Sequence, residues 1–379
     1  MPRRRPNELF CVWKHLTAKM SSATSTSGNA KPYEVQKHDV LFSSTTRYQV
    51  IDFSGEGSFG KVAKCLNIMT GNQVAVKIHK DNGNVSEVIE EEVKMLQAIR
   101  TLDPDKNNIV SFIEDFRFKN LSCLAFEMLD RSLWDLLQER GRIPLNLNEI
   151  RPVIQQLMVA FDALKSIGII HTDLKPDNIM LVNHKDQPFK IKLIDFGLAC
   201  QVSEVPIGTM MQECSYNLIR SIVHLLGQPA DHLLVAGVYS WAYFCLNDDP
   251  HSPGFRLKSP DEFQAETGIQ AQFMFTFFDF VENLEDAVRT YPTKKNDIEF
   301  DDRMAFLSLL KSTLDVDPER RVTPSESLKD PFLSMVHLEK KMENILHRPS
   351  NPRKRLREIF HRGQQNHLLS GREPVTFWG

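Results

Sequence analysis

The chain has 379 residues, of which 41% are hydrophobic and 25% charged, so it is long enough for one two-lobed domain or two small ones. A formal net charge of -3 argues against a surface built as a whole for nucleic acid. No apolar run approaches the roughly 18 residues that a membrane span needs, and the basic N-terminus is not followed by the apolar region of a secretory signal.

The cysteines predict a reducing, intracellular compartment. None of the six forms a CxxC pair or a Cys/His cluster with zinc spacing, so we expect packing thiols. They are Cys11, Cys65, Cys123, Cys200, Cys214 and Cys245.

Two hydrophobic patterns divide the chain. Across residues 48–126 short apolar runs are typical of strands, with one helical interruption, which predicts a small, mostly β lobe. After residue 130 apolar residues recur at helical spacing until Gly168 offers a C-terminal stop, so a mainly helical lobe follows. Within that lobe, residues 179–182 and 190–194 are predicted to form a short hairpin.

A glycine-rich loop lies between two strand-like runs. Its glycines let a hairpin fold tightly over phosphates, with backbone N–H groups facing them. Alone this pattern is weak evidence, because a GxGxxG is as often an ordinary turn. The dinucleotide-binding version needs a helix after the last glycine, whereas here a strand follows. The loop reads Gly55-Glu56-Gly57-Ser58-Phe59-Gly60-Lys61-Val62.

A lysine and a glutamate are predicted to form an ion pair. Lys77 ends the apolar strand Val74-Ala75-Val76-Lys77, where a cation can meet phosphate, although in isolation it would be an ordinary surface lysine. Glu92 falls inside the apolar stripe of the next helix, and an inward carboxylate is costly unless it meets a cation. We therefore pair Glu92 with Lys77; the alternative is that Glu92 lies at the edge of the stripe.

Two further motifs predict phosphoryl transfer. The first is His171-Thr172-Asp173-Leu174-Lys175-Pro176-Asp177-Asn178, and the second is Asp195-Phe196-Gly197. Asp173 suits a base for an incoming hydroxyl, Lys175 stabilises transferred charge, and Asn178 is an amide ligand for Mg²⁺. Asp195 suits the main metal ligand beside the phosphates of ATP, since hard oxygen ligands fit magnesium and not zinc.

These motifs resemble those of the protein kinases, and more closely those of the homeodomain-interacting protein kinases of the CMGC group. The finer match is carried by Phe126-Glu127-Met128-Leu129 as a hinge, Ile150-Arg151-Pro152-Val153 at a helix start, residues 174–182, and Ala265-Glu266-Thr267-Gly268. The resemblance spans about Phe42 to Leu333. It implies an α+β, two-lobed protein-kinase-like fold with a small β-rich N-lobe and a larger helical C-lobe.

The resemblance also implies the domain limits. The kinase domain would cover residues 48–333, with the N-lobe at 48–127, the hinge at 128–131 and the C-lobe at 132–333. We expect residues 1–47 to form a flexible leader and residues 334–379 to form a basic tail.

By the same resemblance the protein would transfer the γ-phosphate of Mg-ATP to a serine or threonine hydroxyl of a protein. Asp173 and Lys175 would be catalytic, and Asn178 and Asp195 would hold Mg²⁺. Lys77 would contact the α and β phosphates with Glu92 as its partner, and backbone groups near Glu127 and Leu129 would receive adenine. The full ATP-binding set would be Gly55, Glu56, Gly57, Gly60, Val62, Ala75, Lys77, Glu92, Glu127 and Leu129.

Two departures from the family are visible. Thr172 replaces the usual arginine of His-Arg-Asp, as in similar kinases of the subfamily. Between Gln212 and Glu213 roughly forty family residues are missing, including the activation-loop tyrosine, Ala-Pro-Glu and the helix that follows. Arg321 resembles the arginine that pairs with the glutamate of Ala-Pro-Glu, so we expect it to be a buried, unpaired cation. The helix at residues 150–167 would also lose a packing neighbour.

The missing stretch leaves alternatives open. The chain is an active kinase, a nucleotide-binding pseudokinase or scaffold, or a poorly folded splice product.

Expected partners are ATP and protein substrates, among them transcription regulators by resemblance, with no membrane and no direct nucleic-acid binding. The basic run at residues 353–357 and the resemblance predict a nuclear location, with the cytoplasm as the alternative. The phenylalanines at residues 273–280 are expected to pack in a core rather than form an exposed patch.

Overall fold

The N-lobe is a single antiparallel sheet in the order β1-β2-β3-β4-β6-β5. The computed structural model describes residues 33–57, 60–79, 86–204, 215–247, 251, 254–270, 280–290 and 297–339. The strands are β1 (Val40–Phe42), β2 (Arg47–Gly57), β3 (Gly60–Asn67), β4 (Gln73–His79), β5 (Phe112–Phe118) and β6 (Leu121–Glu127).

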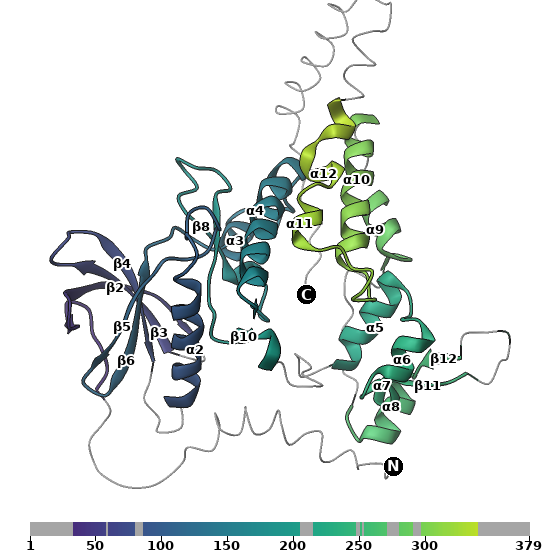
Figure 1. Ribbon diagram of the computed structural model, residues 1–379, viewed down its shortest axis with the longest axis horizontal. Coiled ribbons are helices and arrows are strands. Elements are labelled where there is room, and N and C mark those ends of the chain that lie inside the picture. Colours follow the sequence, from purple (N-terminus) through teal and green to yellow (C-terminus); the bar gives the residue numbers. More distant parts are fainter. Residues whose placement is uncertain are drawn as a thin grey trace, which may run out of the picture.

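Alternation of buried and half-buried residues gives this sheet a core face. In β4, Val74, Val76 and Ile78 are buried, whereas Ala75 and Lys77 point to the other face. Helix α2 (Ser86–Ile99) lies beside the sheet (Figure 1), and its residues Met95, Leu96 and Ile99 join the hydrophobic cluster that continues into the C-lobe. The predicted β-rich lobe with one helix is confirmed.

The sheet of the N-lobe includes residues before residue 48. Val40 pairs with Gln49 across β1 and β2, and Val35 is 5% exposed within the core of the sheet. Residues 33–47 therefore belong to the N-lobe, so the leader predicted to extend to residue 47 is too long. The short apolar run of β1 lies among polar residues, which hid the strand.

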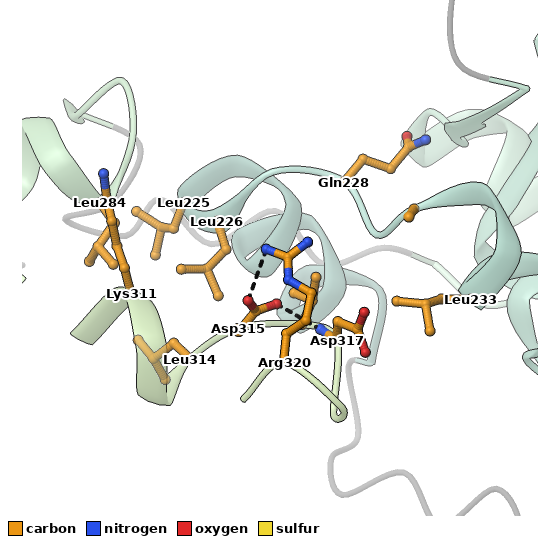
Figure 2. Close-up of a pocket in the computed structure, with 12 residues that line it drawn as sticks. Leu225, Leu226, Gln228, Leu233, Leu284, Lys311, Leu314, Asp315, Asp317 and Arg320 are labelled. Atoms are coloured by element: carbon orange, nitrogen blue, oxygen red, sulfur yellow. Dashed lines mark hydrogen bonds and ion pairs between the residues drawn. The ribbon is translucent and has the colours of Figure 1, made fainter. Parts of the chain in front are cut away.

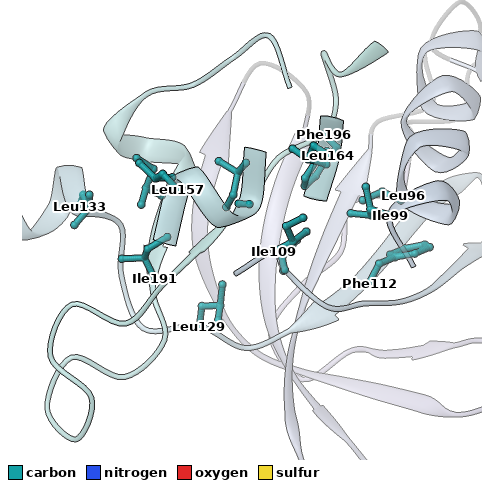
Figure 3. Packing of buried hydrophobic residues seen from close by; sticks show 14 of the residues in the cluster. Leu96, Ile99, Ile109, Phe112, Leu129, Leu133, Leu157, Leu164, Ile191 and Phe196 are labelled. Atoms are coloured by element: carbon teal, nitrogen blue, oxygen red, sulfur yellow. The ribbon is translucent and has the colours of Figure 1, made fainter. Parts of the chain in front are cut away.

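The C-lobe begins with helices α3 (Leu133–Glu139) and α4 (Leu147–Ser166). Asn146 and Glu149 form a capping box at the start of α4, and Gly168, with φ 71°, lies in the left-handed turn after its end. One face of α4 buries Val153, Leu157 and Leu164 in the cluster drawn in Figure 3.

A set of short elements follows α4. They are β7 (Ile169–Ile170), the 3-10 turn η2 (Pro176–Asn178), β8 (Ile179–Leu181), β9 (Ile191–Leu193), β10 (Cys200–Gln201) and the 3-10 turn η3 (Val202–Glu204). Strands β8 and β9 pair antiparallel, with Ile179 opposite Leu193, which confirms the predicted hairpin. Asn178 precedes β8 and Asp195 follows β9, so both motif residues lie at the open end of this hairpin.

The rest of the C-lobe forms two groups of helices (Figure 1). The first is α5 (Ser215–Leu226), α6 (Asp231–Ala236), α7 (Ser240–Tyr243), β11 (Phe244–Leu246), β12 (Phe255–Leu257) and α8 (Pro260–Thr267). It has its own cluster around Tyr216, Tyr243 and Phe263. The second is α9 (Leu284–Thr290), α10 (Asp297–Thr313), α11 (Pro324–Ser327) and α12 (Pro331–Ser334), of which α10, α11 and α12 pack against α4.

Two expectations about exposure are corrected, and one stays open. Arg321 is exposed, and its Nε donates to the Asp315 carbonyl at 2.8 Å, so it is not a buried cation. Phe280 is 67% exposed rather than packed in a core, while the other phenylalanines of that group lie outside the described residues. The predicted gap after Gln212 also lies outside them and stays a prediction.

A buried ion pair fastens α10 to α4. Arg151 and Asp302 are each 6% exposed and form this pair, and Arg151 Nε also donates to the Phe332 carbonyl at 2.8 Å. Replacing Arg151 with methionine leaves a buried carboxylate without its strongest partner. We expect Arg151→Met to lower the unfolding free energy by about 3–5 kcal/mol, measured by denaturant titration.

The matched control is Lys106→Met, which removes the same charge from a side chain that is 83% exposed and 3.5 Å from Asp103. This variant should change stability far less, because exposed pairs contribute little. Equal losses in the two variants would contradict a special role for the buried pair.

Candidate active site

The predicted pair of Lys77 and Glu92 forms, and a third residue joins it. Lys77 Nζ, on β4, lies 2.7 Å from Glu92 Oε1 on α2 and 3.0 Å from Asp195 Oδ1 in the loop after β9. The Glu92 side chain is 4% exposed and that of Lys77 16%. One ammonium group therefore ties the sheet, the helix and the C-lobe motif together.

The opposite charges in this cluster offset the free-energy cost of burying them. Burial raises the pKa of Glu92, and the charge of Lys77 opposes that effect. Burial works to lower the pKa of Lys77, but the charges of Glu92 and Asp195 outweigh it and hold the pKa above its usual value. Burial also works to raise the pKa of Asp195, but Lys77 nearby keeps that pKa below the usual value. Lys77 is thus held as a cation and Asp195 as a carboxylate.

Two positions near the cluster have strained backbones. Thr172 and Asp195 have φ angles of 64° and 61°, in the left-handed region that residues other than glycine seldom adopt. The Thr172 hydroxyl donates to the Leu198 carbonyl at 2.6 Å, which fastens the two motifs to each other. Phe196 is fully buried, whereas the side chain of the neighbouring Asp195 contacts Lys77.

The other predicted catalytic residues form a hydrogen-bonded group. Asp173 Oδ2 accepts from Lys175 Nζ at 2.7 Å and from Asn178 Nδ2 at 2.9 Å. Asn178 is 4% exposed, and its Nδ2 also donates to the Asp173 carbonyl. Among the described residues nothing donates to Asn178 Oδ1, so this oxygen is available to a cation.

The pairing of β8 with β9 brings the two groups together. Asn178 precedes β8, Asp195 follows β9, and the Ile194 N–H donates to the Asn178 carbonyl at 2.9 Å. The two predicted magnesium ligands are therefore at the same end of one hairpin. Magnesium is usually bound by one or two protein carboxylates together with phosphate oxygens and water. The oxygens of Asn178 and Asp195 are consistent with this preference.

The β2–β3 hairpin requires glycine at one described position. Gly60 has φ 147°, and a Cβ there would lie 2.1 Å from the Ile78 carbonyl oxygen. β2 and β3 pair from Tyr48 to Gly57, so a strand follows the loop as expected. Gly55 lies in β2, as do the backbones of Glu56 and Gly57, while Ser58 and Phe59 lie outside the described residues.

The remaining predicted nucleotide contacts line one side of the sheet. Val62 on β3 is opposite Lys77, and Ala75 lies on the same face of β4 as Lys77. Leu129 is 7% exposed, and its N–H has no hydrogen-bond partner among the described residues. This N–H is thus left to donate to an acceptor that a ligand could supply.

The side chain of Glu127 is bonded to other residues of the protein, which leaves its backbone for the predicted contact with adenine. Its carboxylate accepts from the Ser111 N–H at 2.6 Å and from Lys192 Nζ at 2.6 Å, behind the hinge. The sequence analysis missed Lys192, which is 1% exposed. The only signal was a lysine between two apolar residues of a short strand, and its partner lies 65 positions away.

A separate cavity of about 400 Å³ lies in the C-lobe (Figure 2). Leu225, Leu226 and Leu314 form apolar wall, and the ion pair of Arg320 with Asp315, at 3.1 Å, lies at its edge. It shares no residue with the predicted active site.

Comparison with known proteins agrees with the fold and the motifs. The model of the protein kinase domain matches residues 48–218. Homeodomain-interacting protein kinase 2 of Mesocricetus auratus is 36% identical over 357 residues, which cover 83% of this chain and 31% of the relative. Homeodomain-interacting protein kinase 4 of Homo sapiens is 31% identical, covering 78% of this chain and 56% of the relative.

The two-lobed fold and this match define a protein-kinase domain. Over most of its length the chain is similar to the homeodomain-interacting protein kinases, as the resemblance had indicated. It spans about a third of the length of the type 2 relatives. In the part of the chain that the structure describes, no helix combines the length and apolar character needed to cross a bilayer.

The histidine of the first motif generates a pH prediction. His171 Nδ1 accepts the Asp173 N–H at 3.3 Å and Nε2 is 2.9 Å from the Ile194 carbonyl, so the network assigns the neutral ring with its proton on Nε2. Burial lowers the pKa of His171 below its usual 6.5, although the Ile194 carbonyl and two nearby aspartates oppose this. A depressed pKa adds stability above pH 6.5 that is lost as the pH falls through the folded-state value.

We therefore expect the unfolding free energy of the protein to fall between pH 7.5 and pH 5.5, and to fall less in His171→Phe. Denaturant titrations at both pH values measure the difference. An identical pH dependence in the two proteins would exclude a neutral, buried His171.

Proposed function

We propose that this protein is an ATP-dependent serine/threonine kinase. The observation that carries the proposal is the convergence of Lys77, Glu92 and Asp195, with Asn178 at the same end of the hairpin as Asp195. Phosphoryl transfer depends mainly on positioning and on charge stabilisation. A buried cation, two oxygen ligands and an adjacent carboxylate are suited to both.

Each residue has a role in this proposal. Lys77, held by Glu92, binds the phosphates of ATP, and the N–H of Leu129 with the carbonyl of Glu127 binds adenine. Asn178 and Asp195 hold Mg²⁺, whose charge neutralises that of the phosphates. Asp173 accepts the proton of the substrate hydroxyl, and Lys175, 2.7 Å away, stabilises the transferred charge.

The proposed binding of a protein substrate has less support than the proposed binding of nucleotide. The sequence predicts that a family stretch is missing after Gln212. The missing stretch would contain the peptide-docking segment. The second candidate, a nucleotide-binding scaffold, follows from that prediction.

We expect the full chain to transfer labelled phosphate from Mg-ATP to a generic basic protein substrate. Asp173→Asn should lower this rate by about 10²–10⁴-fold, because it removes the proton acceptor and the partner of Lys175. Asp186→Asn is the matched control, since its carboxylate is exposed on the β8–β9 connection and, among the described residues, accepts only from Asn183 Nδ2 at 2.8 Å. It should retain the full rate.

A thermal melt with and without Mg-ATP separates the alternatives. Saturating nucleotide raises the melting temperature of a folded binder. A raised transition without transfer supports the scaffold, and transfer at equal rates in Asp173→Asn and the unchanged protein would sink the kinase proposal. A chain without a cooperative transition is the poorly folded product.

We also propose nuclear location and transcription regulators as substrates, on the basis of the relatives. Removing residues 348–362, which contain Arg353, Lys354 and Arg355, from a fluorescent fusion should shift it towards the cytoplasm. Deleting the polar residues 21–32 is the control. An unchanged distribution after the first deletion would reject the basic run as an import signal.

A further inference from the structure

A buried lysine lies behind the predicted hinge. Lys192, in the middle of β9, has a side chain only 1% exposed, which is costly for an ammonium group unless it is paired. Its Nζ lies 2.6 Å from Glu127 Oε1 at the end of β6 and 2.7 Å from Asp105 Oδ1 in the loop after α2. None of the roles in the proposed phosphoryl transfer uses this cation.

Backbone bonds fasten the same three segments around Lys192. The Leu193 N–H donates to the Asn108 carbonyl at 2.8 Å, and the Val110 N–H donates to the Leu193 carbonyl at 3.0 Å. Ser111 and Glu127 also bond reciprocally, since the Glu127 N–H donates to the Ser111 carbonyl at 3.1 Å and the Ser111 N–H to the Glu127 carboxylate. Figure 3 shows Ile191, Ile109 and Leu129 from these segments.

The hinge is therefore fixed on both sides of its unsatisfied N–H. Before it, the Glu127 carboxylate is held by Lys192 and Ser111. After it, the Asp130 N–H donates to the Leu181 carbonyl at 2.9 Å. Leu129 lies between the two anchors, and its N–H is the group proposed to meet adenine. Among the described residues, Lys192 is the only charged group that holds the Glu127 side.

We propose that Lys192 is a positioning residue that sets affinity for the nucleobase. By holding the Glu127 carboxylate from behind, it fixes the backbone edge of Glu127 and Leu129 before a ligand arrives, and such preorganisation lowers the cost of binding. The inference rests on the proposed nucleotide site. A purely structural role would weaken the binding of every ligand. The proposed role instead predicts that loss of Lys192 weakens binding of the base and leaves binding of the phosphates unchanged.

Isothermal titration of the full chain with three probes tests this. Lys192→Met should weaken binding of Mg-ATP and of adenosine by about ten-fold each, and should leave binding of magnesium tripolyphosphate unchanged. The matched control is Lys190→Met, whose Nζ donates to Asn108 Oδ1 at 2.6 Å and to the Asp105 carbonyl at 3.3 Å. This variant loses a contact with the same loop but none with Glu127, so all three affinities should persist.

Glu127→Gln provides a second route and keeps the test valid if Lys192→Met does not fold. It should show the same loss for adenosine, and the double variant should be no weaker than either single variant, because both remove one interaction. Equal weakening of tripolyphosphate and adenosine, or unchanged adenosine binding in a folded variant, overturns the proposal. An unmodified chain that binds no probe overturns the nucleotide site itself, and this proposal with it.

Discussion

The structure depends on the cost of burying the Glu92 carboxylate. Only a cation can offset that cost at a position 4% exposed, and Lys77 supplies it from β4 at 2.7 Å. Because Lys77 also reaches Asp195, the same interaction sets where α2 lies on the sheet and where the loop after β9 lies beneath it. The two lobes are thereby joined by charge as well as by the shared hydrophobic cluster.

The helical lobe is divided into parts with separate cores. Helix α4 packs with α10, α11 and α12, whereas α5 to α8 surround Tyr216, Tyr243 and Phe263. The residues proposed to bind nucleotide come from the sheet, α2, the hinge and the β8–β9 hairpin. None of them comes from α5 to α8. The proposed nucleotide site therefore does not depend on whether a peptide-docking segment is present.

Much of this arrangement could be predicted from the sequence, for identifiable reasons. An acid inside an apolar stripe predicted its pairing with Lys77, and turn-forming residues between two short strand-like runs predicted the β8–β9 hairpin. Lys192 was missed because a lysine in a short strand usually carries its charge to solvent, and its partners lie far away along the chain. Arg321 was wrongly expected to be buried, since the pattern of a motif does not tell how exposed its arginine becomes.

Lys77 and Lys192 both contact groups connected by the same short strand. Lys192 lies within β9, and Asp195, the second carboxylate of Lys77, follows only two residues after its end. Lys192 contacts Glu127 and Asp195 contacts Lys77, so β9 links the two ends of the proposed nucleotide site. A displacement of this strand would move the proposed base-binding edge and the proposed metal ligand together. We infer that its complete burial at Ile191, Lys192 and Leu193 keeps the two ends at a fixed separation, which a ligand with a base and a triphosphate requires.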